Sequence, residues 1–242
     1  MILPTRISRK LASVLAALLI CTTLHAQSGS VTRPAVVELF TSQGCSSCPP
    51  AEAILGKLAR RTDVLALAFH VDYWDDLGWR DRFALPEAAQ RQRRYVQALR
   101  LSTAFTPQAV IDGRHSLVGS DRERMVAFIN GQRDDIAVKL TIDGGKLLID
   151  LAERTTRSPL DINVVAYLPE ASTPIGRGEN AGRVLQEFNI VRSLKQLGAW
   201  QGQAQQLQLP LSALPQDASR VAVLVQQPNQ GAIVGATAIN IR

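Results

Sequence analysis

Two cysteines separated by two residues are the clearest chemical feature of this sequence. They form the segment Cys45-Ser46-Ser47-Cys48, and the third cysteine of the chain, Cys21, lies in an apolar N-terminal stretch. A disulfide within this segment closes a very short loop and restricts the unfolded chain little, so it is a poor structural link. The spacing therefore predicts thiol–disulfide exchange, while an inert disulfide and a metal site are the alternatives.

The position of the pair in the chain indicates how the two thiols differ. A buried strand is predicted at 35–40, a turn at 41–44 and a helix at 49–61, so the cysteines stand where this helix begins. Amide donors and the helix dipole stabilise a thiolate at such a terminus. We expect Cys45 to be the exposed nucleophile and Cys48, one turn inside, to be the buried resolving thiol. Pro49 and Pro50 are expected inside the first turns, where they remove amide donors.

Further elements must hold this segment in place. The apolar run 64–71 predicts a second strand, and strand–helix–strand over this length forms a right-handed βαβ unit. Pro86 begins a second helix that extends to about residue 101. Asp112-Gly113 predicts a hairpin turn between strands near 106–111 and 117–118, followed by a last helix from Ser120 or Asp121.

The residues above resemble the thioredoxin fold over about residues 34–130. More narrowly, ELFTSQGCSSCPPA at 38–51 and RGENAGR at 177–183 are similar to a secreted bacterial family known only as a domain of unknown function. The resemblance implies a cis bond between Thr106 and Pro107, which would lie against the cysteines and hold the substrate chain. It also implies that a buried acid on the first strand, here Glu38, assists the resolving cysteine.

The kind of secondary structure that the sequence predicts changes near residue 136. Seven short strand candidates follow with little helix, which is typical of a β-sandwich. We therefore predict an α/β protein with a thioredoxin-like domain at 34–133 and a β-sandwich-like domain at 134–242. The longest loop of the second domain is expected at 169–182.

Several other side chains are candidates for the site. Glu38 stands in an apolar strand, where burial is costly unless the carboxylate has a role, and the alternative is an exposed strand edge. Trp74 and Trp79 could line a substrate groove, and the alternative is that they only pack in the core or on the surface. His70, in an apolar strand, is expected to be a core histidine.

The N-terminus predicts the destination of the protein. Residues 1–26 combine a basic start, an apolar run and a small residue at the cleavage point, as in a secretory signal peptide. The formal net charge of +6 falls to +3 without the three basic residues of this segment. We expect a periplasmic or secreted protein with no membrane span after cleavage and no nucleic-acid partner.

These features together predict an exported thiol–disulfide oxidoreductase. Its expected partners are a protein thiol or disulfide substrate and an unidentified redox partner, with no organic cofactor and no metal. The Ser46-Ser47 dipeptide does not indicate the direction of electron flow. Two alternatives are a module that handles Cu(I) through the two cysteines and a non-enzymatic binding protein on a thioredoxin-like scaffold.

Overall fold

One mixed sheet runs through most of the molecule. The computed structural model describes residues 1–2 and 33–242, and Thr32–Arg242 forms one compact unit. The sheet has eight strands in the order β11-β10-β7-β8-β2-β1-β3-β4, and a separate antiparallel sheet has the order β5-β6-β9. The strands are β1 (Ala35–Thr41), β2 (Val64–His70), β3 (Gln108–Ile111), β4 (His115–Val118), β5 (Val138–Asp143), β6 (Lys146–Leu151), β7 (Leu160–Pro174), β8 (Val184–Trp200), β9 (Gln205–Pro210), β10 (Arg220–Gln226) and β11 (Ile233–Asn240).

The predicted βαβ unit is present. Strands β1 and β2 pair in parallel, and helix α1 (Pro49–Leu58) connects them. Strand β3 pairs with β1 in the antiparallel sense and continues into β4. The turn between β3 and β4 has positive φ angles at Asp112 and Gly113, as the Asp-Gly dipeptide predicts.

The two faces of β1 pack against different helices because side chains alternate along a strand. Val37 and Leu39 belong to a core with α1 and α3 (Arg122–Ile129), whereas Val36 and Phe40 belong to a core with α2 (Pro86–Ala98). The side chain at each position of β1 is therefore committed either to the α1 side or to the α2 side. This alternation decides which residues can reach the cysteines.

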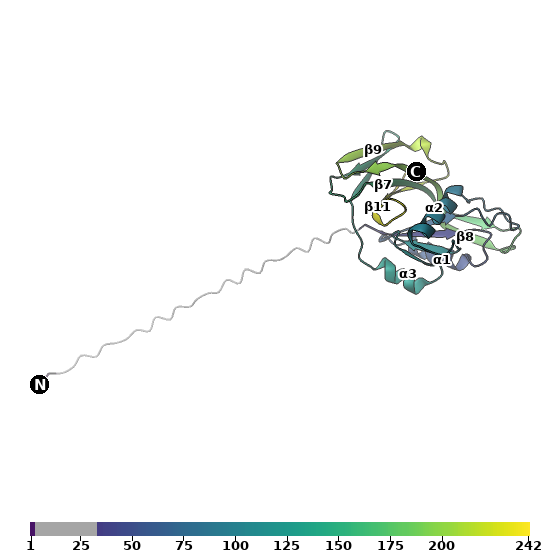
Figure 1. Cartoon of the computed structure of the whole chain (residues 1–242), viewed down its shortest axis with the longest axis horizontal. Helices are drawn as coiled ribbons and strands as arrows, with labels where there is room; N and C mark the ends of the chain where they lie inside the picture. The colour runs from purple at the N-terminus through teal and green to yellow at the C-terminus, as the bar shows by residue number, and fades with distance from the viewer. Residues whose placement is uncertain (3–32) are drawn as a thin grey trace. The chain divides into compact units, whose positions relative to one another are not determined.

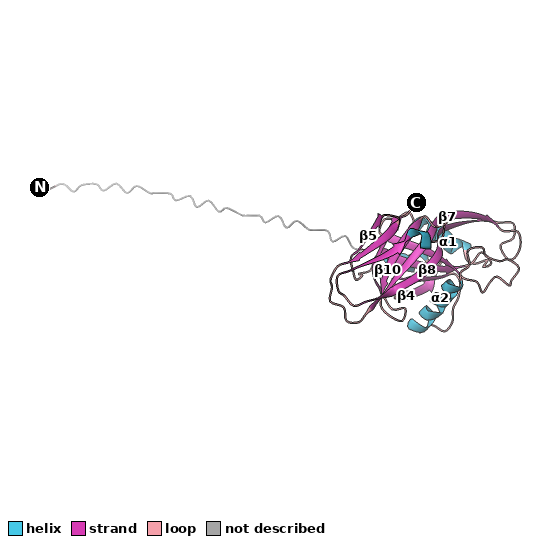
Figure 2. Cartoon of the chain, turned by 90° about the horizontal axis from the view of Figure 1, so that it is seen from above, coloured by secondary structure: helices cyan, strands magenta, loops and turns pink. Residues whose placement is uncertain are grey.

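The C-terminal half is not a self-contained β-sandwich. Its three-stranded sheet does pack on the other sheet, with Leu147 and Ile149 facing Val221 and Val223. However, β7, β8 and β10 are strands of the eight-stranded sheet. Within that sheet β8 pairs with β2, which belongs to the N-terminal half of the chain. The opposite faces of β7 and β10 complete the core under α2, so both halves of the chain share one sheet (Figures 1 and 2). Figure 1 shows α1 and α3 toward one end of the unit and β9 toward the other.

Some predicted boundaries change. Helix α1 ends at Leu58 rather than 61, and β7 continues to Pro174 through the segment predicted as a loop from 169. The prolines Pro49 and Pro50 occupy the first two helical positions, where a missing N–H costs no intrahelical bond. The predicted signal peptide, 1–26, lies outside the described residues except for its first two. Over the described residues, no helix has both the length and the apolar character needed to cross a membrane.

Candidate functional site

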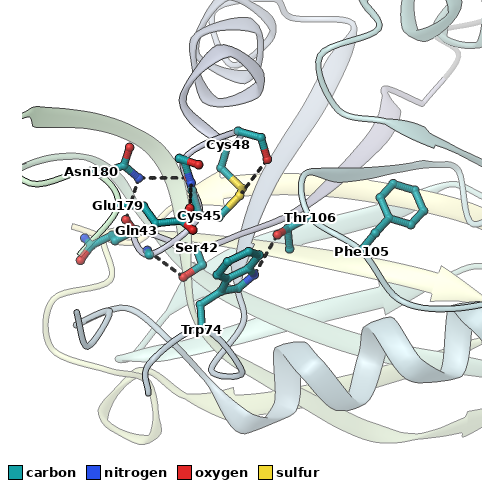
Figure 3. Close-up of a disulfide and its surroundings, with 12 residues drawn as sticks. Ser42, Gln43, Cys45, Cys48, Trp74, Phe105, Thr106, Glu179 and Asn180 are labelled. Atoms are coloured by element: carbon teal, nitrogen blue, oxygen red, sulfur yellow. Dashed lines mark hydrogen bonds between the residues drawn. A yellow bond between two sulfur atoms is a disulfide. The ribbon is translucent and has the colours of Figure 1, made fainter. Parts of the chain in front are cut away.

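The cysteine pair forms a disulfide at the start of α1. Cys48 is the N-cap residue, and Cys45 lies in the turn that leaves β1 (Figure 3). Cys45 is 0% exposed and Cys48 is 1% exposed, so the expectation of an exposed Cys45 is wrong for this oxidised form. The Ser47 hydroxyl lies 3.3 Å from Cys45 Sγ. Because a disulfide sulfur carries no hydrogen, Ser47 is the donor in this contact.

The loop between β7 and β8 holds the backbone around Cys45. The Asn180 amide donates to the backbone oxygens of Gln43 and Cys45, at 2.9 and 3.0 Å. The Glu179 carboxylate accepts the Ser46 N–H at 3.1 Å, and contact with Ser46 lowers the pKa of Glu179. Both residues belong to the RGENAGR stretch, more than 130 residues further along the chain. Glu179 and Asn180 thus form a clamp that holds the backbone of the cysteine loop.

The opposite side of the disulfide meets the segment before β3. The Thr106–Pro107 bond is cis, as predicted. The Trp74 indole N–H donates to the Thr106 hydroxyl at 2.9 Å, and both side chains lie beside the disulfide in Figure 3. A Cβ at Gly119 would touch both Ala51 and Pro107, which places Pro107 close to the first turn of α1. The structure thus brings Trp74, Thr106 and Pro107 together with the cysteines.

Glu38 is buried, but the structure does not bring it to the cysteines. It shares the α2 side of β1 with Val36 and Phe40. Its carboxylate binds Arg91 Nε at 2.6 Å and also accepts the Tyr95 hydroxyl. Glu38 therefore anchors α2 to the sheet. Because side chains alternate along β1, Glu38 faces α2 and not the α1 side, so its prediction as the proton acceptor for Cys48 is wrong.

Trp79 supports the loops around the site rather than forming a wall with Trp74. Its indole N–H donates to Gln43 Oε1 at 2.9 Å. A Cβ at Gly178 would approach Trp79 Cβ to 3.0 Å, so the β7–β8 loop packs directly on this ring. Trp79 is a positioning residue for the turn after β1.

A buried acid–base group that the sequence analysis missed lies behind Cys48. Glu52 is 7% exposed, and neither of its carboxylate oxygens has a hydrogen-bond partner in the described structure. His70, 1% exposed, binds Asp81 Oδ2 through Nδ1 at 2.7 Å, while its Nε2 has no partner there and lies 4.0 Å from Glu187 Oε1. The spacing of Cys48 and Glu52, four residues apart on a helix, is the signal that could have indicated Glu52.

The charges of these groups depend on one another. Burial raises the pKa of Glu52 to about 7, although the neighbouring His70 opposes this change. Burial by itself would lower the pKa of His70, but Asp81, Glu52 and Glu187 together raise it to about 9. The same His70 charge lowers the pKa of Asp81 despite its burial. Near neutral pH, His70 is thus a cation bonded to an Asp81 anion, and Glu52 is present in both protonation states.

A cavity of about 600 Å³ lies between α1 and the beginning of β8 and reaches this group. Its inner end includes Cys48, Glu52, His70 and Glu187, and Cys45 is not part of its lining. Its outer part is formed by residues of α1 and β8 and by Arg60, which follows α1; the α1 and β8 residues are Pro49, Ala53, Gly56, Lys57, Val184, Leu185, Gln186 and Phe188. The cavity therefore connects the surface with one of the two cysteines and with unpartnered polar atoms.

The described residues offer little to a resident metal ion. Within 33–242, no cluster of three or more His, Cys, Asp or Glu side chains is arranged to hold one. Two of the carboxylates near His70 already have partners: Asp81 binds His70, and Glu187 accepts from Gln43 and from the Thr173 hydroxyl, the latter at 2.7 Å. The reactive groups of this site are the Cys45–Cys48 disulfide and the Glu52 carboxyl group beside it.

Comparisons with known proteins place this architecture in a family. A crystal structure of a structural-genomics target from Agrobacterium tumefaciens is 32% identical, with a TM-score of 0.74, and the match covers 87% of this chain and 96% of that one. HBP35 of Porphyromonas gingivalis shares the fold at 16% identity and a TM-score of 0.57, covering 88% and 76%. No curated protein matches the chain. The model of a family of unknown function, DUF1223, matches residues 36–226, and the chain belongs to this family.

Proposed function

We propose that this protein is an exported thiol–disulfide oxidoreductase built on a thioredoxin-like arrangement of β1, α1, β2, β3 and β4. The observation that carries the proposal is the Cys45–Cys48 disulfide beside a buried Glu52 whose carboxylate oxygens are unpartnered. An inert disulfide needs no proton acceptor behind it. A dithiol that cycles between two states needs one, because a thiol must lose its proton before it attacks.

The reaction begins at Cys45. In the reduced protein the Ser47 hydroxyl, 3.3 Å from Cys45 Sγ in the disulfide, is placed to stabilise the Cys45 thiolate. This thiolate attacks one sulfur of a substrate disulfide, forms a mixed disulfide and releases the other substrate sulfur as a thiolate.

The second step belongs to Cys48 and Glu52. Glu52 takes the proton of the Cys48 thiol, and the Cys48 thiolate attacks Cys45 Sγ. The substrate leaves as a thiolate, and the protein disulfide re-forms while the substrate gains two electrons. With a pKa of about 7, Glu52 is present in both protonation states near neutral pH, which suits a group that accepts and returns a proton. The reverse sequence oxidises a substrate dithiol with the same groups.

Substrate would be held by the segment before β3. Thr106, which precedes the cis bond, lies beside the disulfide, and its backbone can pair with an extended chain as an added strand. The Trp74 ring, fixed by its bond to Thr106, offers an apolar surface at the same place. Because Cys45 is fully buried, a protein substrate there requires the cysteine loop to move, and Glu179 and Asn180 are the side chains that hold the backbone of this loop.

Trapping tests the proposal directly. With Cys48→Ala the resolving step is absent, so substrates should accumulate as mixed disulfides on Cys45 in cells that export the protein. The double variant with Cys45→Ala is the matched control and should trap nothing. Equilibration of the wild-type pair with defined ratios of reduced and oxidised dithiothreitol should give a reversible two-electron transition. A pair that exchanges with no thiol and traps no partner would refute the oxidoreductase assignment.

A further inference from the structure

We infer that the cavity behind Cys48 is the binding site of a low-molecular-weight thiol that carries an anionic group, and that this thiol reduces the Cys45–Cys48 disulfide. The inference rests on the proposed function and identifies the class of its redox partner. Its starting point is access. Both cysteines are buried, Asn180 holds the backbone of Cys45, and of the two cysteines only Cys48 lines the cavity that opens between α1 and β8.

The size and lining of the cavity suit a small molecule. A volume of about 600 Å³ lies within the range of roughly 300–1,000 Å³ that is typical of ligand pockets. Apolar side chains such as Phe188 and Leu185 form much of its wall, and a few polar groups lie at its inner end. A folded protein cannot enter such a space, whereas a thiol of a few carbon atoms can.

The inner end holds polar atoms that lack partners. The two carboxylate oxygens of Glu52 and Nε2 of His70 are buried without a hydrogen bond in the described structure. Leaving buried polar atoms unsatisfied is costly, so such atoms in a native cavity indicate a bound group or water. A thiol S–H can donate to Glu52, and a thiolate can accept from His70 Nε2–H.

The mouth of the cavity is cationic. Lys57 in the last turn of α1 and Arg60 just after the helix are exposed, and neither takes part in a salt bridge among the described residues. Facing them across the mouth is β8, where Val184 and Gln186 carry no charge. A carboxylate on the bound thiol would lie near these two cations while its sulfur points toward Cys48.

The chemistry balances with two molecules of the thiol. The first gives its proton to Glu52 and attacks Cys48 Sγ, which forms a mixed disulfide and releases Cys45 as a thiolate. Ser47 stabilises this leaving group, and a better-stabilised thiolate leaves faster. The second thiol attacks the sulfur of the first and releases Cys48. Two thiols become one disulfide, two electrons enter the protein, and both protons finish on Cys45 and Cys48.

Blocking the mouth tests the route. The oxidised protein is mixed with 3-mercaptopropionate or 2-mercaptoethanol, and its reduction is followed by acid quench, alkylation and mass spectrometry. Ala53→Trp, at an exposed α1 position that lines the cavity, should slow reduction by both thiols about tenfold, which corresponds to ~1.4 kcal/mol. Val184→Trp fills the mouth from the β8 side and should act alike. Ala98→Trp, at an exposed position of α2, is the matched control and should change nothing.

Charge at the mouth gives a second readout. Replacing Lys57 and Arg60 by glutamine should slow reduction by 3-mercaptopropionate about threefold while leaving 2-mercaptoethanol unaffected, because an exposed ion pair contributes little. The ratio of the two rates cancels differences in disulfide reactivity between the variants.

Three results would overturn the inference. They are unchanged rates in both tryptophan variants at the cavity mouth, an unchanged rate ratio in the glutamine double variant, and faster reduction by a reduced thioredoxin-type protein that the tryptophan variants do not affect. The last result would show that electrons arrive by the Cys45 side from a protein. In each of these cases dithiothreitol would still equilibrate with the pair, so the oxidoreductase proposal would stand. Failure of that equilibrium is the separate result that removes the proposed function.

Discussion

Replacing Glu52 by glutamine should change how the stability of the protein depends on pH. In the folded state burial keeps the carboxyl protonated up to about pH 7, against 4.5 for the group in water. Between these values the folded protein holds more protons than the unfolded chain. The free energy of unfolding contributed by Glu52 is therefore fully present below about pH 4.5 and is lost as the pH rises through 7.

The size of the effect follows from the two pKa values. Each pKa unit corresponds to ~1.36 kcal/mol, so moving the pKa from 4.5 to about 7 costs the folded protein about 3 kcal/mol once Glu52 is ionised. Glutamine keeps the shape of the side chain but does not ionise. From pH 4 to pH 7.5, the stability of Glu52→Gln relative to the wild type should therefore rise by about 3 kcal/mol.

Urea unfolding of the oxidised protein, followed by tryptophan fluorescence at a series of pH values, measures this difference. The raised pKa of His70 makes the stability of the wild type fall between about pH 6.5 and 9, and Glu52 is one of the groups that raise this pKa, so the comparison ends at pH 7.5, where most of the His70 loss has not yet occurred. Glu123→Gln, at an exposed position of α3, is the control and should follow the wild type. A difference between Glu52→Gln and the wild type that stays constant across the range would refute a raised pKa at Glu52. A difference of opposite sign would show that the carboxylate is stabilised in the folded state.

Three further predictions concern the surroundings of the site. Arg91→Met should lower the free energy of unfolding by about 3–5 kcal/mol, because it leaves the Glu38 carboxylate buried without its cation; urea unfolding measures this, and an unchanged stability would contradict it. Asn180→Ala should accelerate reduction of the disulfide by dithiothreitol several-fold, because the loss of two hydrogen bonds, each of about 1 kcal/mol, loosens the clamp. An unchanged rate would show that the clamp does not limit access to the disulfide. The fragment 134–242 should lack dispersed amide signals in NMR spectra, because β7, β8 and β10 lose the core that they share with α2; a folded spectrum would restore the two-domain description.

The local features of the site were predictable from the sequence because they depend on neighbouring residues. Apolar runs and a proline-led helix fixed the order of β1, α1 and β2. Asp112-Gly113 indicated the turn before β4, and the resemblance to the thioredoxin fold anticipated the cis bond before Pro107. Each of these signals lies within a few residues of the structure that it specifies.

The assignment of the proton acceptor failed for a reason that lies in the tertiary structure. Both Glu38 and Glu52 are acids near Cys48 in sequence, and both are buried. Alternation along β1 places Glu38 on one of two faces, but only the packing of α2 and Arg91 against that face decides which one. A partner for Glu38 more than 50 residues away leaves no local trace.

The sequence by itself determined that a cysteine pair would stand at the start of a helix, since spacing and strand pattern specify this locally. Only the tertiary structure decided that Cys45 is covered, that Glu52 and His70 meet behind Cys48, and that a cavity opens there. Asn180 comes from the loop before β8, and Glu187 from β8 itself, which joins β2 across the sheet. The physical reason is that burial and pKa depend on which distant segments exclude water from a site, and strand order across a sheet sets those neighbours.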